Sequence, residues 1–170
     1  MDAGVDRRIA DSRRRFFIPW LGTVLAVVVL AALGYGLAAG IVAPGATLPA
    51  LPKMMAAAGF VWCGLVLFIR RQVLAPLGMA ARLPAPDPEA LLRHLFAGHL
   101  VLWSAAVVPA IIGIAQILAG GDARMHLLLC SAALMVLGYL LPSRSRLGGL
   151  ATTTLEIWNR AQTAKGYGSP

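Results

Sequence analysis

The fold is decided by residues 13–42, RRRFFIPWLGTVLAVVVLAALGYGLAAGIV, in which three arginines precede an apolar run without a single charge. A bilayer core is crossed by a helix of about 20 apolar residues, so the run from Phe16 to Val42 is long enough to span a membrane. The 170-residue chain is 59% hydrophobic and 13% charged, which lies outside the range of ordinary soluble domains. The sequence therefore predicts a membrane protein.

Three further uncharged runs follow, so that the chain contains four in all. They are Phe16–Val42, Met54–Ile69, Leu95–Leu118 and Met125–Leu141. The second and fourth are slightly short for a span, but flanking basic side chains can extend to the head groups and complete it. We predict an all-α, polytopic membrane protein with four transmembrane helices arranged as two antiparallel hairpins. A basic lead (residues 1–15) and a cytoplasmic tail (143–170) then flank a membrane domain (16–142).

The basic residues are distributed unequally between the two sides of these runs. Only Lys53 and Arg124, of fifteen Lys and Arg, flank one side. The other side holds thirteen: Arg7, Arg8, Arg13, Arg14, Arg15, Arg70, Arg71, Arg82, Arg93, Arg144, Arg146, Arg160 and Lys165. Because cytoplasmic loops carry the Lys and Arg excess, both termini are expected in the cytoplasm of a bacterial inner membrane. Orientation is assigned to Arg13, Arg14, Arg15, Arg70 and Arg71.

The net charge of +8 has two possible kinds of partner, nucleic acid or anionic lipid. No interleaving of aromatic and basic residues suggests a nucleic-acid groove, so we expect anionic lipid head groups as the partner of this surface.

Two candidate packing seams are formed by small residues at helical spacing. Ala32, Gly36 and Gly40 recur every four residues on the first run. Ala106, Ala110 and Gly113 continue a stripe on the third run that begins at His99 and Trp103. Small residues at such spacing allow membrane helices to approach closely. We expect these two seams to pack against neighbouring helices.

Two segments outside the spans carry signals for the start of a helix. Asp87-Pro88-Glu89 combines a capping aspartate, proline at the first helical position and an acid in the first turn. The third helix is therefore expected to begin well before its apolar run. Thr153 and Glu156 have the spacing of a capping box, which predicts a short interfacial helix over 153–164.

His99 is the best placed ionisable residue for a role inside the membrane. Neutral imidazole is a common haem ligand, so His99 is the candidate cofactor ligand, with haem or chlorophyll as the group. The alternative is a hydrogen bond from its ring to a backbone carbonyl, a neighbouring helix or interfacial water. We favour the alternative and expect no cofactor and no metal.

One segment resembles a known family. Ser104-Ala105-Ala106-Val107-Val108-Pro109-Ala110-Ile111-Ile112-Gly113 is similar to the alanine-rich helix of rotary ATPase proteolipid subunits, and the two-hairpin plan is similar to that of the doubled proteolipids. The resemblance covers about ten residues and otherwise only architecture. The position that carries the ion-binding carboxylate in that family is Val107 here, and the predicted orientation is opposite. If the resemblance reflects kinship, it implies a protein that has lost ion carriage.

No catalytic motif can be assembled from these residues, and the seven acidic residues lie outside the apolar runs. We therefore expect a non-enzymatic accessory subunit of a larger energy-transducing or transport complex, with the larger subunits as its partners. Two alternatives stay open. One is a membrane protein that binds haem or chlorophyll through His99, and the other is a small carrier or channel that uses the helix break at Pro109 together with Gln116.

The predicted orientation can be tested with reporter fusions. A fluorescent protein that folds only in the cytoplasm should be active after Ala75 and after Pro170, whereas alkaline phosphatase should be active after Asp122, because positive flanks are retained inside. Alkaline phosphatase activity at the C-terminus would contradict the topology with both termini inside.

Overall fold

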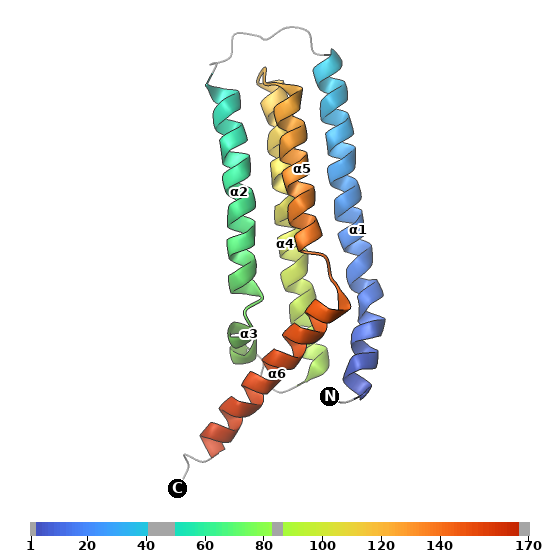
Figure 1. Ribbon diagram of the computed structural model, residues 1–170, viewed down its shortest axis with the longest axis vertical. Coiled ribbons are helices and arrows are strands. Elements are labelled where there is room, and N and C mark those ends of the chain that lie inside the picture. Colours follow the sequence, from blue (N-terminus) through green and yellow to red (C-terminus); the bar gives the residue numbers. More distant parts are fainter. Residues whose placement is uncertain (1–2, 41–49, 83–86, 167–170) are drawn as a thin grey trace. The chain divides into compact units, whose positions relative to one another are not determined.

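The computed structural model describes residues 3–40, 50–82 and 87–166, and within these ranges all secondary structure is helical (Figure 1). The helices are α1 (Ala3–Gly40), α2 (Leu51–Val73), α3 (Pro76–Arg82), α4 (Pro88–Leu118), α5 (Ala123–Tyr139) and α6 (Arg144–Gly166). The all-α class predicted from the sequence is therefore confirmed.

Three segments are long and apolar enough to cross a membrane: Arg15–Gly40, Leu51–Val73 and Glu89–Leu118. They correspond to the first three predicted runs, except that Val42 lies outside the described residues. The fourth run forms α5, an apolar helix of 17 residues. The structure is thus compatible with a multi-pass membrane protein.

Several helix boundaries differ from the sequence prediction. The first helix was expected to start near Phe16 but begins at Ala3, so the arginine-rich lead is helical. The segment between the second and third apolar runs contains an additional short helix, α3. Pro76 lies beyond the end of α2 at Val73 and opens α3, where its missing N–H costs no helical hydrogen bond.

The two predicted helix starts had different outcomes. Asp87 caps α4 as expected, since its carboxylate oxygens accept hydrogen bonds from the backbone N–H groups of Glu89 (3.0 Å) and Ala90 (3.2 Å). The capping box at Thr153 is wrong, because Thr153 lies inside α6. That helix begins nine residues earlier, where the hydroxyl of Ser143 accepts a hydrogen bond from the N–H of Arg146.

The chain divides into two compact units, which are described separately. The four-helix unit comprises Trp20–Phe68 and Val101–Leu141. The terminal unit comprises Met1–Pro19, Ile69–Leu100 and Pro142–Pro170. Helices α1, α2 and α4 contribute residues to both units.

In the four-helix unit, α5 contacts each of the other three helices. These helices run side by side, and successive ones alternate in direction (Figure 1). A Cβ atom on Gly59 of α2 would lie 2.7 Å from a methyl carbon of Leu129 on α5, so a larger residue at position 59 would require the Leu129 side chain to move. Leu129, Ala133 and Leu137 on the same helix are buried. Helix α5 therefore takes part in the packing of all three neighbouring helices.

Pro109 interrupts the backbone hydrogen bonding of α4 within this apolar unit. Proline has no N–H, so the carbonyl of Ala105, four residues earlier, loses its helical hydrogen bond. The indole Nε1–H of Trp62 on α2 donates to this carbonyl oxygen at 2.9 Å. An unpaired carbonyl in hydrocarbon is costly. Trp62 therefore joins α2 to α4 at the point where α4 needs an external donor.

Two other tryptophans donate to the end of α5 in the same way. The N–H of Leu141 would bond the carbonyl of Leu137 in a continuing helix, but it bonds Gly138 instead. The indole of Trp20 on α1 donates to the Leu137 carbonyl at 2.9 Å. That of Trp103 on α4 donates to the Leu140 carbonyl at 3.4 Å. Trp20 thus joins α1 to α5.

In the terminal unit, α3 packs against α6, and both helices contribute buried side chains, among them Met79, Ala80, Leu147 and Ala151. The hydroxyl of the buried Thr154 donates to the carbonyl of Leu150 in its own helix, which satisfies this polar group internally. The first half of α6 therefore rests on α3. Toward the C-terminal end of α6, the side chains of residues 159–164 are exposed.

The role of Trp62 predicts a specific pattern of stability changes. Trp62→Phe removes the donor to Ala105 and should destabilise the protein by about 1–3 kcal/mol, the cost of an unsatisfied buried carbonyl. In a Pro109→Ala background the restored N–H can serve Ala105, so the same change should cost less. Thermal unfolding in detergent of the wild type, the two single variants and the double variant measures the difference. Equal losses in both backgrounds would contradict the assignment.

Candidate functional site

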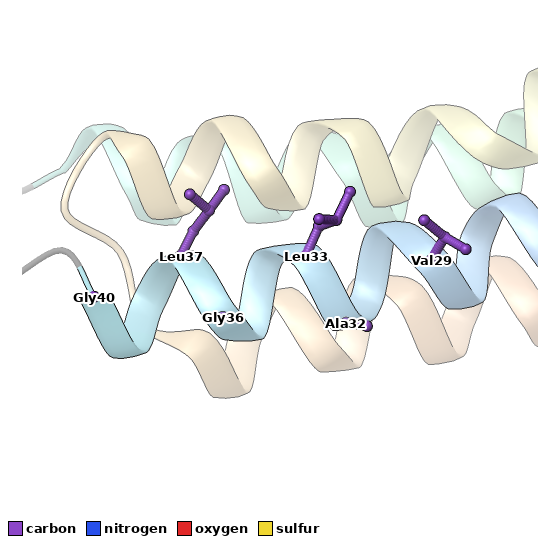
Figure 2. A pocket seen from close by; sticks show the side chains of 6 residues that line it. All are labelled: Val29, Ala32, Leu33, Gly36, Leu37 and Gly40. Carbon is purple, nitrogen blue, oxygen red and sulfur yellow. The ribbon is translucent and has the colours of Figure 1, made fainter.

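The seam predicted on α1 lies on an exposed face of that helix. Ala32, Gly36 and Gly40 are exposed, and no atom lies within 4 Å of a Cβ atom built on either glycine. Together with Val29, Leu33 and Leu37 they line a shallow apolar groove along this single helix (Figure 2). We call these six residues the α1 groove. This seam is therefore not used for packing within the described part of the chain.

The seam predicted on α4 lies on the inner face of its helix. Ala106, Ala110 and Gly113 are all buried in the four-helix unit. A methyl group on Gly113 would overlap with the imidazole of His126 on α5. The two seams have similar sequences but different environments. The small residues of the α4 seam pack inside the unit, whereas those of the α1 seam are exposed on the surface.

His126 is the most enclosed polar side chain of the four-helix unit, with 0% of its surface exposed. Its Nε2–H donates to the backbone carbonyl of Leu30 on α1 at 3.2 Å, which assigns the proton to Nε2. The ring lies between Gly34 of α1 and Gly113 of α4, since a methyl group on either glycine would overlap with it. His126 thus connects three helices in the space left by two absent side chains.

The thiol of Cys130 completes this environment. Its Sγ atom lies 3.6 Å from Nε2 and 3.9 Å from Nδ1 of His126, one helical turn away on α5. Gln116, also buried, directs its Nε2 at the carbonyl of Asp122 (3.4 Å) at the α4–α5 turn. No group of three or more His, Cys, Asp or Glu side chains with the geometry of a metal site occurs among the described residues.

His99, the candidate cofactor ligand, belongs to the terminal unit and is 5% exposed. Its Nδ1 is 2.8 Å from the carbonyl of Leu95, one turn earlier on α4. Phe16 packs edge-on against the imidazole with ring centroids 5.6 Å apart, and also contacts Phe96. Axial ligation of a macrocycle needs an open face beside the ring nitrogen. The bond of Nδ1 to the Leu95 carbonyl is the intrahelical hydrogen bond expected as the alternative, and it leaves Nε2 as the ring nitrogen at which a cofactor would have to bind.

The other predicted residues are distributed over both units. Arg15 and Arg71 are exposed and Arg70 is half-buried, all in the terminal unit. The side chains of Arg13 and Arg14 lie outside the described residues. Val107, at the position of the proteolipid carboxylate, is half-buried on α4.

Sequence reasoning missed the role of His126. The available signal was its position in an apolar helix four residues before Cys130, but the two glycines that accommodate it lie 79 residues apart in the chain. Only the packing of α1, α4 and α5 brings them together.

Comparison of the chain with family models, with curated proteins and with solved structures gives no match.

The position of His126 predicts unequal effects of two nearby substitutions on α1. Gly34→Ala places a methyl group against the imidazole and should destabilise the protein by about 1–3 kcal/mol, as overpacking does. Gly36→Ala, two residues away on the opposite face, adds a methyl group in open space and should be neutral or slightly stabilising. Thermal unfolding in detergent compares the two. Similar values for both variants would show that His126 does not occupy this position.

Proposed function

We propose that this protein is a non-enzymatic accessory subunit of a larger energy-transducing or transport complex in a bacterial inner membrane. In this role the α1 groove receives a transmembrane helix of a larger subunit. The observation that carries the proposal is the outward position of Ala32, Gly36 and Gly40, with open space beside both glycines.

The uneven burial of the membrane-spanning segments supports this role. Only 11% of the apolar window of α1 is buried within the chain, against 44% for α4. Lipid accepts an exposed apolar face, but bulky residues such as Leu and Val satisfy that requirement without small ones. Small residues give an advantage where a second backbone approaches closely. The α1 groove therefore suits a neighbouring helix better than lipid alone.

The proposed topology has four spans with both termini in the cytoplasm. The 17 residues of α5 extend about 26 Å at 1.5 Å per residue, slightly less than the roughly 30 Å hydrocarbon core. Leu140 and Leu141 continue the apolar segment before Pro142. Since α5 runs antiparallel to α4 within the four-helix unit, it returns toward the side from which α4 starts (Figure 1). The thirteen basic residues assign that side to the cytoplasm, where anionic lipids are further partners.

Three side chains that donate hydrogen bonds between helices of the four-helix unit support a structural role. His126 bonds the Leu30 carbonyl, and Trp62 and Trp20 bond the carbonyls of Ala105 and Leu137. Each of these side chains is engaged with the backbone of a neighbouring helix. The resemblance to proteolipid hairpins is the reason for proposing an energy-transducing or transport complex as the setting, and Val107 in place of the carboxylate fits a subunit without ion carriage.

The test is purification from the native membrane in mild detergent, followed by identification of the proteins that accompany the chain. Larger subunits in stoichiometric amount are expected. A small particle that contains this chain alone would overturn the accessory role.

A matched pair of variants tests the α1 groove itself. Gly36→Leu fills the groove and should reduce recovery of the larger subunits about tenfold or more, a change that corresponds to roughly 1.4 kcal/mol. Gly64→Leu makes the same change at an exposed glycine of α2 with no atom within 4 Å of its Cβ position, and should leave recovery unchanged. Full recovery with Gly36→Leu would place the interface elsewhere on the protein.

A further inference from the structure

Gln116 lies in the last turn of α4, next to the turn that leads into α5. Its backbone carbonyl accepts a hydrogen bond from the N–H of Gly121 (2.9 Å), and that of Ile117 accepts one from Gly120 (2.9 Å). Gly120 has a φ of 83°, the left-handed conformation with which glycine commonly ends a helix. These hydrogen bonds hold the turn against the end of α4. The Gln116 side chain beside the turn is buried, with 2% of its surface exposed.

The orientation of the Gln116 amide follows from its neighbour. Its nitrogen lies 3.4 Å from the carbonyl oxygen of Asp122, an arrangement that requires the N–H end at this position. The reverse orientation would place two oxygens together. A methyl group on Gly121 would overlap with the amide, so the space around it is fixed by that glycine. The acceptor atom Oε1 therefore points away from Asp122.

Oε1 of Gln116 is buried and accepts no hydrogen bond from any group in the described part of the chain. A buried amide oxygen without a donor is costly, and such atoms in proteins are commonly satisfied by ordered water. The same unit supplies an indole donor to the carbonyl that Pro109 leaves unpaired. An acceptor that the described part of the chain leaves unpaired thus points to a bound donor.

We propose that Gln116 binds one buried water molecule at the α4–α5 turn, which donates a hydrogen bond to Oε1. Two features favour water over an ion. The C-terminal end of α4 carries partial negative charge, which favours a hydrogen-bond donor and disfavours an anion. A metal cation needs several oxygen ligands, whereas the described residues supply one unpaired buried side-chain oxygen here. The α4–α5 turn then contains an ordered water molecule inside the four-helix unit.

The test uses the full-length protein in lipid nanodiscs with nitrogen-labelled glutamine side chains. The chain has three glutamines, and the other two, Gln72 and Gln162, are exposed. Loss of one signal in Gln116→Met assigns the buried amide. A magnetisation transfer from a long-lived water to the Gln116 amide protons is expected in the wild type. Its absence would overturn the proposal.

Two variants provide an independent measurement. Gly121→Ala displaces the amide, and the water signal should disappear although Gln116 is retained. Gln116→Met keeps the size of the side chain and removes its polar atoms. If water satisfies Oε1, this variant should unfold at a lower temperature than the wild type. A higher unfolding temperature would mean that the oxygen is dry and unpaired, which contradicts a bound water.

Discussion

The imidazole of His126 occupies a space that exists only because two helices carry glycine where they face it. Gly34 and Gly113 both leave room for the ring, and the carbonyl of Leu30 accepts a hydrogen bond from its Nε2–H. In lipid, helices gain little from apolar burial alone, so close packing and interhelical hydrogen bonds determine how they associate. His126 provides both at once for α1, α4 and α5. The position of α1 in the four-helix unit depends on this contact.

The same constraint explains how tryptophan is used in this unit. A backbone carbonyl in an apolar environment must find a donor inside the protein. In the described part of the unit such carbonyls arise at the proline in α4 and at the end of α5. Trp62, Trp20 and Trp103 supply their indole N–H groups at these points. Each indole adds a large apolar surface to its single donor, so that it packs the bundle while it satisfies the backbone.

Two glycines only two residues apart lie on opposite faces of α1, one inner and one outer. Gly34 faces His126, whereas Gly36, about 200° further around the helix, lies in the exposed α1 groove. The two glycines are indistinguishable by composition and differ only in what the rest of the protein places beside them. An inner glycine fixes the fold, and an outer one remains available to a second protein. This division is the basis of the accessory role proposed above.

The sequence by itself determined the all-α class, the long apolar helices and the cap at Asp87, because hydrophobic length and capping chemistry are local properties. It located α1, α2, α4 and α5 approximately, but it missed α3 and misplaced the start of α6, although Pro76 and Ser143 are local signals of the same kind as Asp87. Which seam faces inward and where His126 lies were decided only by the tertiary structure. Both depend on residues that are far apart in the chain, and helical spacing alone does not specify which faces meet.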